Sequence, residues 1–96
     1  MARRRYIITY DISDQKRLRS VARTLEGYGV RLQFSVFECL LDSLRLSKAK
    51  TALQEIIDAS EDQILIIYLG PEATDVGLSM DFLGRPYLER TLLTIV

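Results

Sequence analysis

Two different apolar periodicities follow each other along the first third of the chain. Residues 4–10 are rich in Ile, Tyr and Thr and contain no breaker, which predicts a strand. Ser13 and Asp14 then mark the start of a helix, with Ser13 as the N-cap and Asp14 in the first turn. An apolar stripe with the i, i+3, i+4, i+7 spacing of an amphipathic helix follows, made of Leu18, Val21, Ala22 and Leu25. We expect this helix to end at Gly27-Tyr28-Gly29.

The middle of the chain combines an extended segment with a second helix. Residues 30–41 alternate apolar and polar positions. Their length allows one long strand or two strands with a bend, and no glycine marks a turn. Asp42-Ser43 then opens a second helix. The buried stripe of this helix consists of Leu46, Ala49, Ala52, Leu53, Ile56 and Ile57.

The last third of the chain contains one strong strand. Glu61-Asp62 predicts a polar turn, and residues 63–69 predict a strand that is apolar on both faces. Gly70-Pro71 breaks this strand. Residues 72–90 have a mixed pattern that predicts no single element, and residues 92–96 predict a short apolar terminal strand.

The predicted order is β-α-β(β)-α-β with an additional terminal strand. The fold that suits this order is an α/β (α+β) ferredoxin-like βαββαβ fold, which places both helices on one face of an antiparallel sheet. With 96 residues, the chain fits one domain. We assign residues 4–70 to its core and residues 71–96 to a C-terminal extension and edge strand.

The predicted sheet is too apolar to leave one face in water. An antiparallel sheet with helices on one side should have a polar open face. Residues 64–69 are apolar throughout, and residues 6–10 are nearly so. A C2 homodimer is the simplest cover for the second face. Residues 92–96 would then add an edge strand to their own sheet or to that of the partner.

Two residue types exclude whole classes of chemistry. Cys39 is the single cysteine, which excludes an intramolecular disulfide and a cysteine-based zinc site within one chain. The chain has no histidine, which removes Ser-His-Asp and Cys-His triads and HExxH zinc sites. The longest apolar run, residues 64–69, is far too short to span a bilayer. We therefore expect a cytoplasmic protein without a membrane partner.

Basic residues concentrate at the start of a chain that is neutral overall. Residues 1–33 contain eight basic and three acidic residues, so their net charge is +5. Lys16, Arg19 and Arg23 share one helix face, opposite the apolar stripe. Arg17 flanks the apolar stripe, and Arg31 follows in the next extended segment. Such a surface suits contacts with nucleic-acid phosphates, and the competing interpretation is a solvated, salt-bridged surface.

Asp11 is the strongest candidate for chemistry. It ends the first predicted strand just before a helix, where ligands commonly bind in α/β architectures. Strand alternation places Asp11 on one face with Ile7 and Thr9, and Tyr10 on the other. The competing interpretation is that the Asp11 side chain only shapes the strand–helix turn.

A lone Asp11 is a poor nuclease site, because magnesium takes one or two carboxylates together with substrate phosphate and water. A homodimer would supply the second carboxylate if two Asp11 side chains meet across the two-fold axis. A divalent ion between them would offset their repulsion and activate water for attack on a phosphodiester. We therefore expect Mg²⁺, with Mn²⁺ as the alternative ion, at Asp11. We assign the nearby Asp14 to stabilisation of the first helical turn.

Three further side chains have two interpretations each. Tyr28 and Phe37 could stack on bases, although a phenylalanine in an extended segment is more often a core residue. We interpret Cys39 as a small buried hydrophobic residue.

Four motifs carry a resemblance to a known family. Tyr10-Asp11-Ile12 is followed by a helix with Lys16-Arg17 and then by Leu25-Glu26. The fourth motif runs Tyr28-Gly29-Val30-Arg31-Leu32-Gln33-Phe34-Ser35-Val36-Phe37-Glu38-Cys39. Together these motifs resemble the CRISPR-associated protein 2 family over residues 5–70, and residues 71–96 follow the family only loosely.

The resemblance implies a ferredoxin-like homodimer whose long extended segment breaks into two strands near Phe34-Ser35. It implies a magnesium-dependent endonuclease activity, in some members, on single-stranded RNA or double-stranded DNA. It also implies assembly with the CRISPR integrase, in which this protein spans the new spacer DNA as an adaptor. By position, the metal aspartate of the family falls on Asp11. Its other functional positions fall on Tyr10, Arg17, Arg31, Ser35 and Phe37.

The residue pattern and the family resemblance together predict the site residues. The expected catalytic residues are Asp11, Tyr10, Ser35 and Phe37, with Asp11 as the metal ligand. The expected nucleic-acid-binding residues are Lys16, Arg17, Arg19, Arg23 and Arg31.

Three functions remain open at this point. The first is a metal-dependent endonuclease of CRISPR adaptation. The second is a non-catalytic adaptor that grips duplex DNA with the same basic surface, and in which Asp11 is structural. The third is a regulatory domain that binds a small anion, as many ferredoxin-like domains do.

Overall fold

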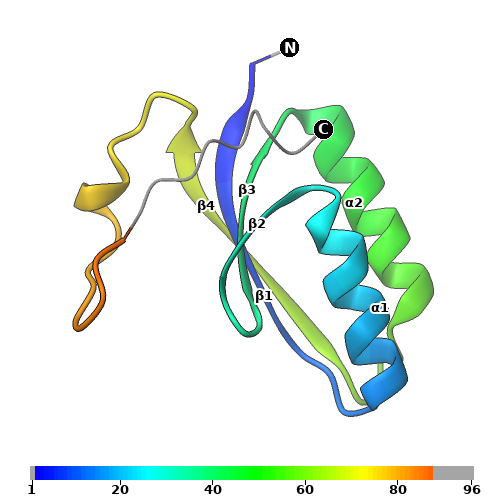
Figure 1. Ribbon diagram of the computed structural model, residues 1–96. Coiled ribbons are helices and arrows are strands. Elements are labelled where there is room, and N and C mark those ends of the chain that lie inside the picture. Colours follow the sequence, from blue (N-terminus) through cyan, green and yellow to red (C-terminus); the bar gives the residue numbers. More distant parts are fainter. Residues whose placement is uncertain (1, 88–96) are drawn as a thin grey trace.

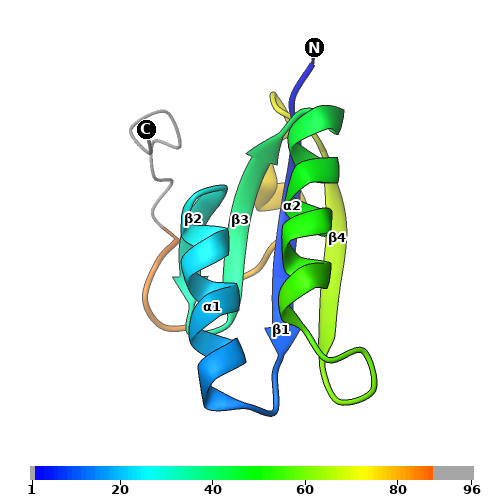
Figure 2. The same cartoon turned by 90° about the vertical axis from the view of Figure 1, so that its right-hand side faces the viewer.

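The computed structural model describes residues 2–87, which form a four-stranded sheet covered by two helices (Figure 1). The strands have the order β2-β3-β1-β4, and all neighbouring strands are antiparallel. Both helices lie side by side over one face of the sheet (Figure 2). The order of elements is that of the ferredoxin-like βαββαβ fold, so the predicted fold class is confirmed. The elements are β1 (Arg4–Asp11), α1 (Gln15–Glu26), β2 (Gly29–Gln33), β3 (Val36–Leu41), α2 (Ser43–Ile56), β4 (Gln63–Pro71) and a 3₁₀ turn, η1 (Val76–Leu78).

The extended segment 30–41 consists of two strands. β2 and β3 are joined by a turn at Phe34-Ser35, as the family resemblance implied. Gly29, at the start of β2, has no room for a side chain, because a Cβ atom there would collide with the Glu38 carbonyl oxygen and Cys39 Sγ. This close approach lets β2 pack tightly against β3.

Both helices begin at an aspartate N-cap. The Asp42 side chain accepts a hydrogen bond from the Arg45 backbone N–H at 2.8 Å, and the second helix starts where it was predicted. At the first helix, the prediction of Ser13 as N-cap is wrong. Asp14 has the extended backbone of an N-cap, and its carboxylate accepts from the Arg17 backbone N–H at 2.9 Å. Because Asp14 is the N-cap, the Ser13 side chain does not cap the helix, and it contacts the loop before β4 instead.

The core lies between the sheet and the helices. Alternation along β1 sends Tyr6, Ile8 and Tyr10 into this core, as predicted. The other fully buried side chains come from β3 and the two helices, and include Phe37, Cys39, Leu41, Val21, Leu25 and Leu53. The interpretation of Cys39 as a small buried hydrophobic residue is confirmed.

β4 is longer than predicted. It continues through Gly70 and Pro71, where the sequence pattern predicted a break. Gly70 has a φ of 124°, and the register between β1 and β4 shifts between Arg5 and Tyr6. The glycine therefore produces a bulge inside the strand instead of ending it.

The open face of the sheet is partly covered by the chain itself. Residues 76–87 lie on the side of the sheet opposite to the helices (Figure 1). A pocket of about 310 Å³ separates Ile7, Val36 and Ile67 of the sheet from Met80 and Phe82. Leu65 and Ile67 nevertheless remain 51% and 41% exposed. The cover that the sequence predicted is thus supplied in part by the same chain, and the exposed remainder still favours a second copy.

The covering segment is fastened at both ends. Glu72 forms an ion pair with Arg3 at 2.7 Å, and its carbonyl oxygen accepts from Arg5 Nη2 at 2.9 Å. At the other end, Tyr87 Oη donates to Glu38 Oε1 at 2.7 Å. The predicted terminal strand, residues 92–96, lies outside the described residues. Neither helix in the described range is long and apolar enough to cross a membrane.

Candidate functional site

Asp11 is the last residue of β1 and points away from the helices. It is exposed and lies on the open face with Ile7 and Thr9, opposite Gln63 of β4. Within residues 2–87 its carboxylate has no hydrogen-bond or ion-pair partner, so both oxygens are available to a ligand. The side chain does not cap or brace the strand–helix turn, a role that Asp14 fulfils.

One chain by itself has no cluster of metal-ligating side chains at this place, as far as residues 2–87 are concerned. Among residues 2–87, no three Asp, Glu or Cys side chains gather in a way that could hold a metal ion. Asp14 is committed to the N-terminus of α1 through its bond to the Arg17 N–H. Asp11 is therefore the carboxylate that each chain could contribute to a shared site.

The loop after Asp11 is held by a buried carboxylate, that of Asp62. Its side chain is completely buried and accepts from the Ser13 backbone N–H at 3.0 Å and from Arg17 Nε at 2.8 Å. The Asp58 backbone N–H, at 2.9 Å, is a further donor. Asp62 thus joins the start of α1 to the loop between α2 and β4, which the sequence analysis had described only as a polar turn.

The Arg17 guanidinium holds the pKa of the Asp62 carboxyl well below its usual range, with help from the Asp58 and Ser13 backbone N–H groups. The same bond raises the pKa of Arg17. Glu61 accepts a second, longer contact from Arg17 at 3.4 Å. Arg17 is therefore engaged in an intramolecular ion pair, in contrast to the other expected phosphate-binding residues.

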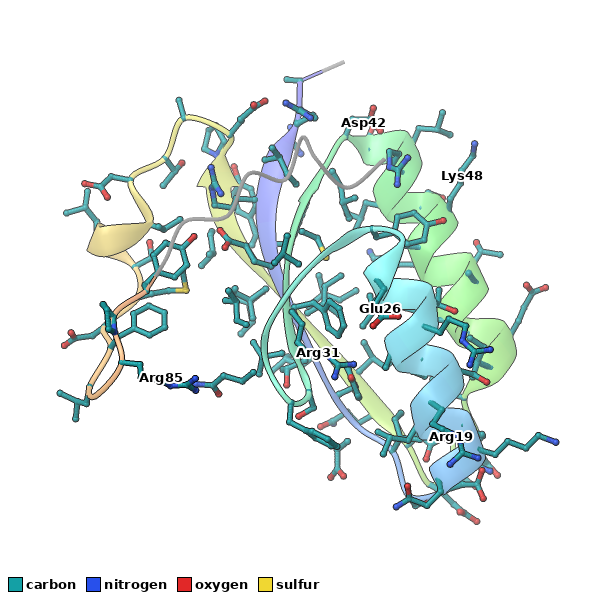
Figure 3. The ribbon with its side chains drawn as sticks, in the orientation of Figure 1. Arg19, Glu26, Arg31, Asp42, Lys48 and Arg85 are labelled. Carbon is teal, nitrogen blue, oxygen red and sulfur yellow. The ribbon has the colours of Figure 1, made fainter. Side chains whose placement is uncertain are left out.

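The remaining basic residues of α1 are free. Lys16, Arg19 and Arg23 are exposed, and within the described part of the chain none of them forms an ion pair. Figure 3 shows Arg19 on α1 and Arg31 on the neighbouring β2. We refer to Lys16, Arg19 and Arg23 as the basic stripe. The stripe has the exposure that phosphate binding requires, and its role in nucleic-acid binding stays a prediction beside the alternative of a solvated surface.

Tyr10 and Phe37 form a buried aromatic pair. Their ring centroids are 6.3 Å apart, and the Tyr10 hydroxyl donates to the Phe34 carbonyl oxygen at 3.3 Å. Burial raises the pKa of Tyr10, and the nearby Arg31 opposes this shift. Phe37 is fully buried, so the alternative interpretation of Phe37 as a core residue describes it correctly. Both rings are buried in the described chain, and their expected catalytic role stays a prediction.

Arg31 and Ser35 connect this aromatic pair to the surface. The Arg31 guanidinium lies 5.2 Å from the centroid of the Phe37 ring and is exposed, so it can meet a phosphate while stacking on the core. The Ser35 carbonyl oxygen accepts from the Tyr10 backbone N–H at 3.2 Å. Ser35 is half-buried in the β2–β3 turn, and its backbone serves to fix that turn. Tyr28, the other candidate for base stacking, packs against the Arg45 guanidinium at 4.9 Å.

Two ion pairs, one half-buried and one fully buried, join residues that are far apart in the sequence, and neither was predicted. One is Arg17–Asp62, and the other joins Arg5 to Glu38 at 2.9 Å, with both side chains less than one-tenth exposed. The partners of each pair are 45 and 33 residues apart. The sequence hinted only at the second pair, because Arg5 and Glu38 are charged residues within segments that are predicted as strands.

The fold and these residues define a class: a small ferredoxin-like protein with a free acidic residue at the end of β1 and a free basic stripe on α1. The family model described as CRISPR associated protein Cas2 matches residues 4–75. The chain belongs to this family, as its motifs indicated.

Individual relatives agree with the family assignment. The CRISPR-associated endoribonuclease Cas2 1 of Rhodospirillum rubrum is 42% identical over 92 residues, which cover 94% of this chain and 89% of that protein. The CRISPR-associated endonuclease Cas2 of Halalkalibacterium halodurans is 44% identical over 69 residues, covering 67% of this chain and 72% of the relative. The crystal structure of Streptococcus pyogenes Cas2 superposes with a TM-score of 0.74 at 34% identity, covering 83% of this chain and 99% of that one.

Proposed function

We propose that this protein is a CRISPR-associated endonuclease whose metal site forms from the Asp11 residues of two chains. The observation that carries the proposal is the free, exposed carboxylate of Asp11 at the end of β1. The names of the relatives, endoribonuclease and endonuclease, support the same reaction class. The lack of histidine leaves a carboxylate as the natural ligand and restricts the choice of general base.

The donor type at Asp11 fits a hard divalent cation. Carboxylate oxygens are preferred ligands of Mg²⁺ and suit Mn²⁺ equally. Two Asp11 side chains would hold the ion. When bound, it would supply Lewis-acid activation of water and neutralise charge at the phosphodiester. No described residue of α1 competes for the Asp11 carboxylate, which is the condition such a site requires.

The basic residues would hold the nucleic-acid backbone. The basic stripe and Arg31 are exposed and free to contact phosphates. Arg17 would act differently from our expectation, since its guanidinium is bound to Asp62. Phosphate contacts of this kind position a substrate without reading its sequence. Tyr10, Phe37 and Ser35 would contribute by fixing the β2–β3 turn and the position of Arg31.

A cleavage assay with an Asp11→Ala variant tests the proposal. We expect loss of Mg²⁺-dependent cleavage of both single-stranded RNA and duplex DNA, with nucleic-acid binding and dimerisation unchanged. Asp14→Asn is the matched control, because it removes a neighbouring carboxylate but preserves the N-cap. This control should cleave like the wild type. Undiminished cleavage by Asp11→Ala would refute the assignment.

A second candidate function is a non-catalytic adaptor that assembles with the CRISPR integrase and spans spacer DNA. The observation that favours it is the basic stripe, which exists on α1 independently of Asp11. This function predicts that Asp11→Ala supports spacer acquisition in cells, whereas charge reversal at Arg19 and Arg23 does not. Both roles can belong to one protein, and the two variants measure them separately.

A further inference from the structure

The Asp62 carboxylate contacts the β1–α1 loop, the first turn of α1 and the loop between α2 and β4. Five hydrogen bonds reach its two oxygens, and they come from Ser13, Arg17 and Asp58. All five are donated to Asp62, two of them by the Arg17 guanidinium. A buried carboxylate with this many donors is firmly fixed and holds its donors in turn.

These bonds restrain Asp11 from both sides. Ser13 follows Asp11 by two residues, and its backbone N–H donates to Asp62 Oδ1 at 3.0 Å. The Ser13 hydroxyl lies 2.9 Å from Glu61 Oε1 and 3.2 Å from Asp62 Oδ1, and these two acceptors share its single proton. On the neighbouring strand, Asp62 directly precedes Gln63, which is the cross-strand partner of Asp11. The backbone that carries the Asp11 carboxylate is therefore tied to Asp62 along its own chain and through β4.

The Asp11 side chain itself is not restrained. It has no partner within residues 2–87, so any precision in the placement of its carboxylate must come from its backbone. A metal site built from two such carboxylates requires that each be placed within a fraction of an ångström.

We propose that Asp62 is a positioning residue for the metal site at Asp11. This inference rests on the proposed function, because it concerns the same Asp11 carboxylate. Asp62 fixes the Ser13 backbone and the first residue of β4, and it thereby sets the distance and direction of the Asp11 carboxylate. Its charge is needed, because an asparagine would turn an NH₂ group toward a ring of donors.

Direct titration with Mn²⁺, followed by electron paramagnetic resonance, tests this role without any cleavage. The variants are Asp62→Asn and Asp11→Asn, and Leu41→Val serves as a control for general destabilisation, because Leu41 is fully buried and pairs with Arg4 at the other end of β1 from Asp11. All measurements are made on dimeric protein at a temperature where circular dichroism shows each variant to be folded. Amide hydrogen exchange at Ser13 reports whether the bond to Asp62 is lost.

We expect Asp62→Asn to raise the Mn²⁺ dissociation constant about 10-fold, which is typical when a residue that orients a metal ligand is changed. The Ser13 amide should exchange faster in the same variant. Leu41→Val should bind Mn²⁺ like the wild type. If Asp62→Asn does not fold, Ser13→Ala replaces it, since it removes the hydroxyl part of the link and should weaken binding in the same direction by a smaller factor.

Two results would overturn the inference, and they are distinguishable. Wild-type Mn²⁺ affinity in Asp62→Asn or Ser13→Ala, despite faster exchange at Ser13, would remove the positioning role and leave the metal site intact. Equal Mn²⁺ affinity in Asp11→Asn and wild type would remove the metal site itself, and the proposed function with it.

Discussion

At the scale of single residues, the environment gives two aspartates opposite roles. Asp11 and Asp62 lie at the adjacent ends of β1 and β4. Asp11 faces solvent without a partner among the described residues, whereas the Asp62 side chain is completely buried and surrounded by donors. A carboxylate without partners can bind a metal ion. A carboxylate whose oxygens already accept hydrogen bonds stabilises the fold instead. The proposed division of labour between them follows from this difference.

The acid sensitivity of the fold should reveal the Asp62 ion pair. Arg17 lowers the pKa of the Asp62 carboxyl, so the folded state favours the charged carboxylate. The stabilisation is fully present above the unfolded-state pKa of about 3.9 and is lost as the pH falls through the lower folded-state pKa. Urea unfolding of wild type and Asp62→Asn should therefore show a large gap in midpoint at pH 7 that shrinks below about pH 4. A constant gap at all pH values would contradict this assignment.

The sequence predicted the position of Asp11 but could not predict Asp62. Strand alternation alone places Asp11 on the open face, because that pattern is local. The N-cap was assigned one residue too early, since Ser13 and Asp14 are both good caps and only tertiary contacts occupy Ser13. Asp62 and Arg17 are 45 residues apart, and no local sequence pattern around either residue predicts that they form an ion pair.

At the scale of elements, α1 presents two distinct surfaces. Val21 and Leu25 are fully buried against the sheet, while the basic stripe faces outward. Arg17 lies between these surfaces and pairs with Asp62. Exposed cations without intramolecular partners are the ones that can exchange their counterions for nucleic-acid phosphates.

Charge reversal on α1 should therefore weaken nucleic-acid binding without affecting the fold. For Arg19→Glu/Arg23→Glu we expect lower affinity and a slope of log K against log salt that is reduced by about 2 on duplex DNA, roughly one unit per lost phosphate contact. Fluorescence anisotropy over a salt series measures both quantities. Lys48→Glu/Lys50→Glu places the same change on exposed residues of α2 and should leave the slope nearly unchanged. Equal effects of the two double variants would argue against a stripe-specific interface, and salt-independent binding would favour a small-anion site.

The division of residues 30–41 into two strands shows where local pattern fails. The turn at Phe34-Ser35 has no glycine or proline to mark it. It is held instead by Tyr10, whose hydroxyl and backbone N–H bond to the carbonyl oxygens of Phe34 and Ser35. These bonds come from β1, so composition within the segment left the choice open. The family resemblance implied the break near Phe34-Ser35, because the fold of a family includes contacts between distant segments.

At the scale of the whole molecule, the open face of the sheet is only half covered. Residues 76–87 lie over it, yet Leu65 and Ile67 of β4 stay exposed, and Leu83 of the covering segment is 97% exposed. Apolar side chains gathered in this way usually mark a protein–protein interface. A symmetric dimer through this face would turn both Asp11 side chains toward the interface, since Asp11 shares the open face.

A charge on the open face should dissociate the dimer. We expect the wild type to sediment as a dimer at micromolar concentration and Leu65→Glu to raise the dissociation constant at least about 10-fold, equivalent to about 1.4 kcal/mol. Leu44→Glu is the matched control, because Leu44 is similarly exposed, at 54%, but lies in α2 on the other layer. Analytical ultracentrifugation distinguishes these cases. A monomeric wild type would leave each Asp11 alone and remove the basis of a shared metal site.

The burial of Cys39 has a practical consequence for all of these experiments. Its thiol lies behind Gly29 in the core, and burial raises its pKa to about 12. At pH 7 the thiol is then protonated, and the thiolate is the form that reacts with oxidants and binds metals. The protein should keep a single redox state in air. Manganese titrations can thus be run without dithiothreitol, which would itself chelate the ion, and any dimer that persists on a non-reducing gel cannot be attributed to the native fold.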